Sequence, residues 1–135
     1  MNLFEWKDSY SVDILSIDND HQGLLKIINQ LFEAMSHGKA SDLISEYIIQ
    51  LLNYTKTHFE REEYYFSTTN YPDTFEHKLQ HQFFIEKIQE FKTQLENGDK
   101  KISIELIKFL SDWLINHIII SDKKYMVHLK NNGAS

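Results

Sequence analysis

Seven histidines stand in a chain of 135 residues, and carboxylates accompany several of them at regular spacing. Glu62 follows His58 by four residues, and His81 follows His77 by four. Side chains four residues apart lie on the same face of an α-helix, so each pair can point at one ion. Imidazole nitrogens and carboxylate oxygens suit first-row metals, iron and manganese among them. The chain has no cysteine, which excludes thiolate sites and iron–sulfur clusters, so the sequence predicts a metal centre of nitrogen and oxygen ligands.

The number of candidate ligands points to more than one ion. His21, His117 and Asp122 join the four residues above, which gives five imidazoles and two carboxylates. This set exceeds what one ion takes from a protein, and two ions that share two bridging carboxylates are the economical arrangement. If a solvent oxygen also bridges, an ion with three histidines is six-coordinate and an ion with two is five-coordinate. One coordination position then stays open for a small ligand.

Apolar residues recur at spacings of three and four along most of the chain, which predicts amphipathic helices. An extended N-terminal arm is expected over about residues 1–17. Four helices are expected over about residues 18–37, 42–66, 72–96 and 101–130. Asp18 or Asn19 is expected to cap the first helix, and Pro72 to lie in the first turn of the third. Short loops between long helices favour a single all-α domain over residues 1–135, an up-down-up-down antiparallel four-helix bundle.

Such a bundle brings the candidate ligands to one end. In an antiparallel arrangement the starts of the first and third helices meet the ends of the second and fourth. At a rise of about 1.5 Å per residue, the five candidate histidines fall within roughly two or three turns of the same end. A lone histidine in a helix is usually a surface or core residue. Five of them at one level, with one from every helix, favour a site instead.

Asp122 does not fit a regular helix as a partner of His117. It lies five residues further on, which places it about 140° round an ideal helix and away from the face of His117. If Asp122 is a ligand, the helix must widen locally, as a π-bulge does, or the site must lie between the two positions. The sequence therefore predicts a distortion between His117 and Asp122.

Composition excludes several other classes of protein. Fourteen basic residues against 20 acidic ones give a net charge of -6, the wrong sign for a nucleic-acid binder. No apolar run approaches the roughly 18 residues of a membrane-spanning helix, so no membrane partner is expected. Glu5, Lys7 and Asp8 interrupt the apolar stretch that a signal peptide requires. These features favour a cytoplasmic protein.

In the order and spacing of these residues the chain resembles the hemerythrin family, in its single-domain bacterial form. The resemblance covers about residues 4–129. Four fragments carry it: Ile17-Asp18-x-x-His21, His58-Phe59-x-x-Glu62-Glu63, Tyr71-Pro72 followed by His77-x-x-x-His81, and Trp113-Leu114-x-x-His117-Ile118-x-x-x-Asp122-Lys123-x-Tyr125. Each fragment alone is a weak signal, but seven ligand positions in order on four helices form a specific pattern.

The resemblance implies a non-haem di-iron centre, bridged by an oxo or hydroxo group, that binds O2 reversibly. Three histidines would hold the coordinatively saturated iron: His77, His81 and His117. His21 and His58 would hold the iron with the open position, and Glu62 and Asp122 would bridge the two ions. Apolar residues would form an O2 pocket at the open position: Leu24, Phe59, Trp113, Leu114 and Ile118.

The expected function is O2 binding for carriage, storage or delivery, without enzymatic turnover. Five neutral imidazoles with two carboxylates favour reduced and O2-bound iron over the high-valent iron of carboxylate-rich bundles. The main alternative is a redox enzyme that reduces peroxide or nitric oxide with electrons from an external donor. A sensor acting through a partner, iron or oxygen homeostasis, and a structural bundle are the others. An electron donor or an O2-consuming enzyme could be the partner, and the oligomeric state stays open.

A few residues depart from the family pattern. Asp13 and Asn70 stand where glycine is frequent, and Phe66 stands where methionine is frequent. Asp20 stands where glutamine often precedes the first histidine, and it is expected to add a negative charge beside His21. Glu63 follows Glu62 directly and is expected to face solvent.

Overall fold

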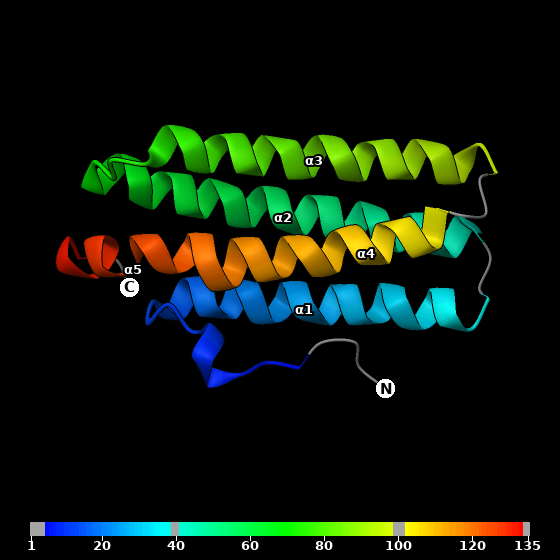
Figure 1. Ribbon diagram of the computed structural model, residues 1–135, viewed down its shortest axis with the longest axis horizontal. Coiled ribbons are helices and arrows are strands. Elements are labelled where there is room, and N and C mark those ends of the chain that lie inside the picture. Colours follow the sequence, from blue (N-terminus) through cyan, green and yellow to red (C-terminus); the bar gives the residue numbers. More distant parts are fainter. Residues whose placement is uncertain (1–4, 39–40, 99–101, 134–135) are drawn as a thin grey trace.

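The computed structural model describes residues 5–38, 41–98 and 102–133, and it is an all-α four-helix bundle. Its long elements are α1 (Leu15–Ser36), α2 (Ser41–Thr69), α3 (Thr74–Glu96) and α4 (Ile102–Leu114), and α4 continues through the π-helical stretch η2 (Ile115–Ser121) into α5 (Asp122–Asn131). Figure 1 shows consecutive helices running antiparallel in up-down-up-down order, with the arm and its short helical turn η1 (Asp8–Tyr10) beside α1. Among the described residues, no helix is long and apolar enough to cross a membrane.

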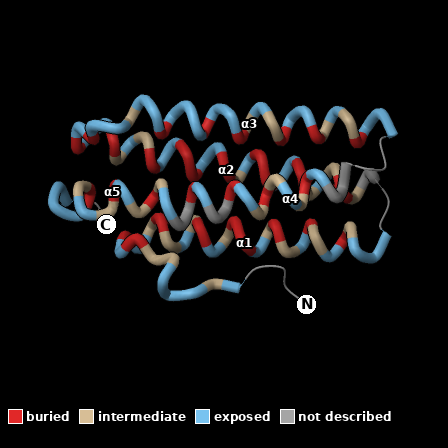
Figure 2. Tube along the Cα trace, viewed as in Figure 1, coloured by how far each residue is buried: buried red, intermediate tan, exposed pale blue. Residues whose placement is uncertain are grey.

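Each helix buries one face, and Figure 2 shows these buried faces turned toward the centre of the bundle. The larger core cluster fills most of the length of the bundle and includes Leu24 and Ile28 of α1 and Phe84 of α3. A smaller cluster closes one end: Val12, Ile14, Ile17, Phe66, Tyr71, Tyr125 and Leu129. Complete burial of an apolar side chain of this size contributes about 1.5–3 kcal/mol, so these stripes are the main stabilisation of the fold.

The candidate ligands lie between the two clusters. On α2, Glu62 lies between Phe59, a member of the larger cluster, and Phe66, a member of the smaller one. The same order holds on α1, where His21 lies between Ile17 of the smaller cluster and Leu24 of the larger one. Apolar side chains therefore close the ligand layer from both sides and keep it away from water.

The first helix begins at Leu15, three residues before the predicted start at Asp18. Asp18 lies within the first turn and does not cap the helix. Its carboxylate instead accepts hydrogen bonds from the Ser11 hydroxyl at 2.5 Å and the Val12 N–H at 2.9 Å. Asp18 thereby fixes the arm to the start of α1, and the predicted arm of residues 1–17 was too long at its C-terminal end.

The second helix runs to Thr69, beyond the predicted end at Phe66. The chain then turns at Asn70, whose φ of 54° is the left-handed conformation in which many helices end. The N–H of Tyr71 donates back across this turn to the carbonyl of Phe66 at 3.1 Å. A reversal of this kind is set by one backbone dihedral, which apolar periodicity does not report.

The remaining predicted helix bounds differ by small amounts. Pro72 lies in the turn before α3 and not in its first turn, because α3 begins at Thr74 after Asp73. The predicted start of the last helix, Lys101, lies outside the described residues. That helix ends at Asn131, one residue beyond the predicted end.

The predicted distortion between His117 and Asp122 is confirmed. The stretch Ile115–Ser121 is π-helical, and the regular α-helix resumes at Asp122. In a π-helix residue i bonds to residue i+5, so side chains five apart can share a face. His117 Nε2 and Asp122 Oδ1 accordingly lie 3.1 Å apart.

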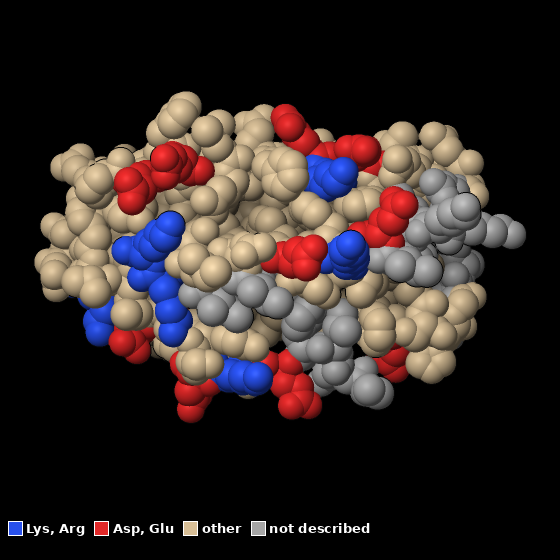
Figure 3. Space-filling model, in the orientation of Figure 1, with Lys and Arg blue, Asp and Glu red and all other residues tan. Residues whose placement is uncertain are grey.

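The surface carries charges of both signs. On the face shown in Figure 3, lysine and arginine side chains lie beside aspartate and glutamate side chains. Exposed pairs such as Lys92 with Glu96, 2.6 Å apart, add little to stability. The described residues of this face form no continuous basic surface, in keeping with the net charge of -6.

Replacing Asn70 by alanine should lower the free energy of unfolding by about 1 kcal/mol, because a left-handed alanine brings its Cβ close to the following carbonyl oxygen. Asn70→Gly should avoid this cost, since glycine adopts positive φ freely. Urea denaturation of both variants measures the difference. Asn53→Ala, at an exposed position inside α2, is the control and should not destabilise the chain. Equal stabilities for the two Asn70 variants would contradict the prediction.

Candidate metal centre

The candidate ligands lie together in one buried layer. Each of the four helices of the bundle contributes, the fourth through η2 and α5: His21 from α1, His58 and Glu62 from α2, His77 and His81 from α3, His117 from η2 and Asp122 from α5. None of these residues is more than 3% exposed. Polar and charged groups are costly to bury unless partners replace their water. The layer therefore needs either internal partners or a bound cation.

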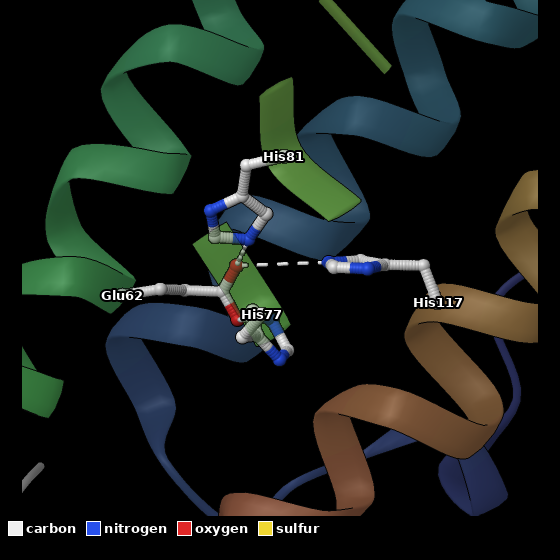
Figure 4. Close-up of side chains that lie close together, drawn as sticks. All are labelled: Glu62, His77, His81 and His117. Carbon is white, nitrogen blue, oxygen red and sulfur yellow. Dashed lines mark hydrogen bonds and ion pairs between the residues drawn. The ribbon is translucent and has the colours of Figure 1, made fainter. Parts of the chain in front are cut away.

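One group of ligands consists of Glu62 with three histidines. Ligand atoms of Glu62, His77, His81 and His117 all lie within 4.8 Å of one another. Figure 4 shows the Glu62 carboxylate pointing among the three imidazole rings. Its Oε1 is 3.1 Å from His81 Nε2 and 3.8 Å from His117 Nε2, and its Oε2 is 3.7 Å from His77 Nε2. Three nitrogens and a carboxylate converge there on one small volume.

A second group lies beside the first. Ligand atoms of His21, His58, Glu62 and Asp122 also lie within 4.8 Å of one another. His21 Nε2 is 2.9 Å from Asp122 Oδ2, and His58 Nε2 is 3.1 Å from Glu62 Oε1. This group has two histidines where the first has three, so an ion bound here would receive fewer nitrogens from the protein.

The two carboxylates contact histidines of both groups. Glu62 Oε1 is 3.1 Å from His58 Nε2 and 3.1 Å from His81 Nε2. Asp122 also contacts both groups, with Oδ2 2.9 Å from His21 Nε2 and Oδ1 3.0 Å from His77 Nε2. Both carboxylates thus contact histidines of the two groups at once.

Three of the histidines have a hydrogen-bond acceptor on the nitrogen that faces away from the layer. An acceptor in that place holds the ring proton on Nδ1 and leaves a lone pair on Nε2. The pairs are His58 Nδ1 with Asp20 Oδ2 at 3.0 Å, His81 Nδ1 with Glu63 Oε2 at 3.1 Å, and His117 Nδ1 with Gln80 Oε1 at 3.2 Å. The lone pairs of these rings therefore point into the layer.

Most of the atoms that face inward lack hydrogen-bond partners, although His81 Nε2 and Glu62 Oε1 are hydrogen-bonded to each other at 3.1 Å. Among the described residues this holds for Nε2 of His21, His58, His77 and His117, for Oε2 of Glu62 and for both carboxylate oxygens of Asp122. Nitrogen and oxygen lone pairs face each other there at distances of 2.9–3.1 Å. This arrangement is repulsive unless a cation or a proton lies between them. A pair of first-row divalent ions fits both the donors and their grouping.

In the metal-free chain, protons compensate the charge of the carboxylates. Burial alone would lower the pKa of His58, but the negative charge of Glu62 and the hydrogen bond to Asp20 raise it to about 10. Burial acts in the same direction on His77, yet the carboxylates of Asp122 and Glu62, 3.0 Å and 3.7 Å from its Nε2, raise its pKa to about 9. Glu62 is buried too, but its histidine neighbours hold its pKa well below the usual range.

Apolar side chains line the layer on the side of the larger core cluster. Leu24, Phe59 and Trp113, three of the residues expected in an O2 pocket, are buried there. Phe59 stacks on His81 with ring centroids 3.8 Å apart, and Trp113 stacks on His117 at 4.4 Å. The side chains of the other two expected pocket residues, Leu114 and Ile118, lie outside the described part of the structure. The O2 pocket therefore stays a prediction.

Two neighbouring acids have partners that the sequence did not predict. Glu63 does not simply face solvent, because its carboxylate accepts a hydrogen bond from His81. The Asp20 carboxylate contacts His58 of α2, whereas the sequence predicted only a charge beside its neighbour His21. Both acids are adjacent in sequence to a ligand, which was a signal that they lie near the site. Each one's partner, however, lies on a different helix, which spacing along one helix does not reveal.

Comparisons of the sequence with a family model and with known proteins indicate the same family. The model of the hemerythrin HHE cation binding domain matches residues 13–129, a range that contains all of the candidate ligands. A bacteriohemerythrin of Clostridium acetobutylicum is 32% identical over 92% of this chain and 99% of its own length. A bacteriohemerythrin of Pseudomonas aeruginosa is 35% identical over 90% of this chain and 78% of its own length.

Solved structures share the same fold. A crystal structure of wild-type hemerythrin superposes with a TM-score of 0.83 over 94% of this chain and 98% of that chain. The sequence identity of this pair is 23%, so the likeness concerns the arrangement of the helices.

The metal-free chain should lose stability as the pH rises from about 7 to about 9. His58 and His77 keep a proton in the folded chain up to pKa values of about 10 and about 9, and release it near 6.5 when unfolded. Their stabilising contribution is complete below pH 6.5 and is lost as the pH rises through the folded values. The free energy of unfolding should fall by on the order of 1 kcal/mol per pH unit for each proton.

Urea denaturation of the metal-free protein at several pH values in this range measures the effect. His58→Gln should reduce the slope, because one of the two protons is then gone. His37→Gln, at an exposed position after α1, is the control and should leave the slope unchanged. A free energy of unfolding that increases with pH over this range would show that the buried histidines are not protonated.

Proposed function

The chain belongs to the hemerythrin family, and on that premise we propose that it binds O2 reversibly at a non-haem di-iron centre, for carriage, storage or delivery. One observation carries the proposal: five buried imidazoles converge on two shared carboxylates, and the inward nitrogens of four of them have no hydrogen-bond partner. That arrangement needs protons or metal cations between the side chains, and nitrogen with oxygen ligands suits iron.

Each ligand has a proposed place. His77, His81 and His117 would hold the saturated iron, and His21 and His58 would hold the iron with an open position. Glu62 and Asp122 would bridge the two ions, a role supported by their contacts with histidines of both groups. The bound irons would supply the electrons that O2 takes up on binding and returns on release.

The protein around the layer would protect this chemistry. Phe59 and Trp113 stack flat on two of the histidines, which fixes the ring planes and leaves little room for water. Leu24 adds to the same wall, and we propose that Leu114 and Ile118 complete it. A dry apolar surface admits O2 while hindering the water and anions that promote irreversible oxidation.

The donor set favours a carrier over a redox enzyme. Bundles that form high-valent iron use several inward glutamates, whose negative charge stabilises the higher oxidation states. In the part of the chain that the structure describes, Glu62 and Asp122 are the carboxylates that face the inward nitrogens. The nearby acids Asp20 and Glu63 contact outer nitrogens instead. Neutral imidazoles should thus keep the ions near the oxidation levels that reversible binding needs.

Optical spectra of the iron-loaded protein test the proposal. The reduced, anaerobic protein should contain about two irons per chain and be almost colourless, should gain a visible band when O2 is admitted, and should lose it when O2 is removed. Repeated cycles without substrate consumption would support a carrier. Irreversible oxidation on first contact with O2, or turnover of peroxide or nitric oxide with a reductase, would contradict it.

Replacing His77 by alanine should remove metal and lower stability. Metal that binds only the folded state at about 100 times its dissociation constant adds ~2.7 kcal/mol, which corresponds to roughly 10 °C in melting temperature. His77→Ala should lose most of this gain on metal addition and should bind less than the wild-type amount of iron. Calorimetry and iron analysis measure both effects.

His37→Ala is the matched control, since this histidine is exposed and lies outside the layer. It should retain the full iron content and the full metal-dependent rise in melting temperature. Equal melting temperatures for metal-loaded and metal-free wild-type protein would mean that the metal does not bind preferentially to the folded layer.

A further inference from the structure

The outer nitrogen of His58 contacts the carboxylate of Asp20, and Arg61 holds this carboxylate in place. His58 Nδ1 lies 3.0 Å from Asp20 Oδ2, and the same oxygen accepts a hydrogen bond from Arg61 Nε at 2.7 Å. The Asp20 side chain is 13% exposed and that of His58 is 1% exposed. Asp20 therefore places its carboxylate on the back of the imidazole, where the Arg61 guanidinium holds it in position.

A carboxylate in this place acts on a metal through the ring. It holds the proton on Nδ1, sets the orientation of the imidazole and increases the electron density at Nε2. Nε2 of His58 points into the layer, 3.1 Å from Glu62 Oε1. The charge of Asp20 is thus transmitted to the place where an ion would bind, although Asp20 itself does not reach it.

The three-histidine group has a weaker arrangement of this kind. His81 Nδ1 lies 3.1 Å from Glu63 Oε2, but the Glu63 side chain is 33% exposed, against 13% for Asp20. His117 faces the neutral amide of Gln80. Water screens an exposed charge more than a buried one, so Glu63 should influence its histidine less than Asp20 does.

We propose that Asp20, held by Arg61, is a positioning residue that strengthens metal binding in the pocket of His21 and His58 and lowers the reduction potential of the ion bound there. The inference rests on the di-iron centre proposed above and adds to it a residue that contacts neither the ions nor O2. A more electron-rich imidazole stabilises the higher oxidation state of its ion. Asp20 would therefore set how readily the iron with the open position gives up an electron.

Zinc is the probe for the test, because it is diamagnetic and takes nitrogen and oxygen ligands. NMR spectra of zinc-loaded protein with 15N-labelled histidine give separate ring signals for His58 and His81. The position and exchange rate of each Nδ1–H signal report its hydrogen bond to the carboxylate behind it. Competition with a chelator, followed through the same signals, gives the zinc affinity of each pocket.

Asp20→Asn removes the charge and keeps the size of the side chain. In this variant the zinc affinity of the His21 and His58 pocket should fall about tenfold or more, and the His58 Nδ1–H signal should shift and exchange faster. The His81 signal should stay in place. Glu63→Gln should do the reverse, with a smaller change confined to His81.

Glu60→Gln is the control, since Glu60 is exposed on α2 next to Arg61 and carries the same charge. A loss of zinc affinity in Glu60→Gln equal to that in Asp20→Asn would overturn the inference, because contact with His58 would then be irrelevant. The inference also fails if the wild type binds two zinc ions and Asp20→Asn keeps both the affinity and the His58 signal. Fewer than two zinc ions in the wild type would overturn the proposed two-ion centre itself.

Discussion

The burial of five histidines and two carboxylates at one level of a four-helix bundle is the constraint on which the rest of the structure depends. Most of their inward nitrogen and oxygen atoms have no hydrogen-bond partner among the described residues, so cations or protons must compensate them. In the metal-free chain protons provide this compensation, and the pKa of His58 is raised accordingly. Two apolar clusters enclose the layer, and α1 packs against α2 beside it.

Backbone geometry determines most of the site, which is why much of it follows from the sequence. The four-residue spacing of His58 with Glu62 puts both side chains on one face of α2, whatever the neighbouring helices do. Asp122 is the instructive case. Five residues after His117, it could not share a face of a regular α-helix with that histidine. The sequence therefore predicted a distortion, and η2 confirms it.

Features that depend on how helices rotate against each other could not be predicted. Glu63 reaches His81 on α3, and Asp20 reaches His58 on α2, because of the rotation and register between packed helices. Asp18 is a residue type that often caps helices, yet its side chain binds the arm instead, and α1 starts earlier than expected. A single left-handed residue, Asn70, decides where α2 ends. Each of these outcomes depends on a tertiary contact or one dihedral, and neither leaves a periodic pattern in the sequence.

Anomalous diffraction at the iron edge, from crystals of the iron-loaded protein, tests the central claim most directly. The account predicts two iron peaks about 3.5 Å apart within the buried layer. One should lie against the group of His77, His81 and His117, and the other against His21 and His58, with the two carboxylates between them. A single peak in the layer, or iron bound outside it, would contradict the account.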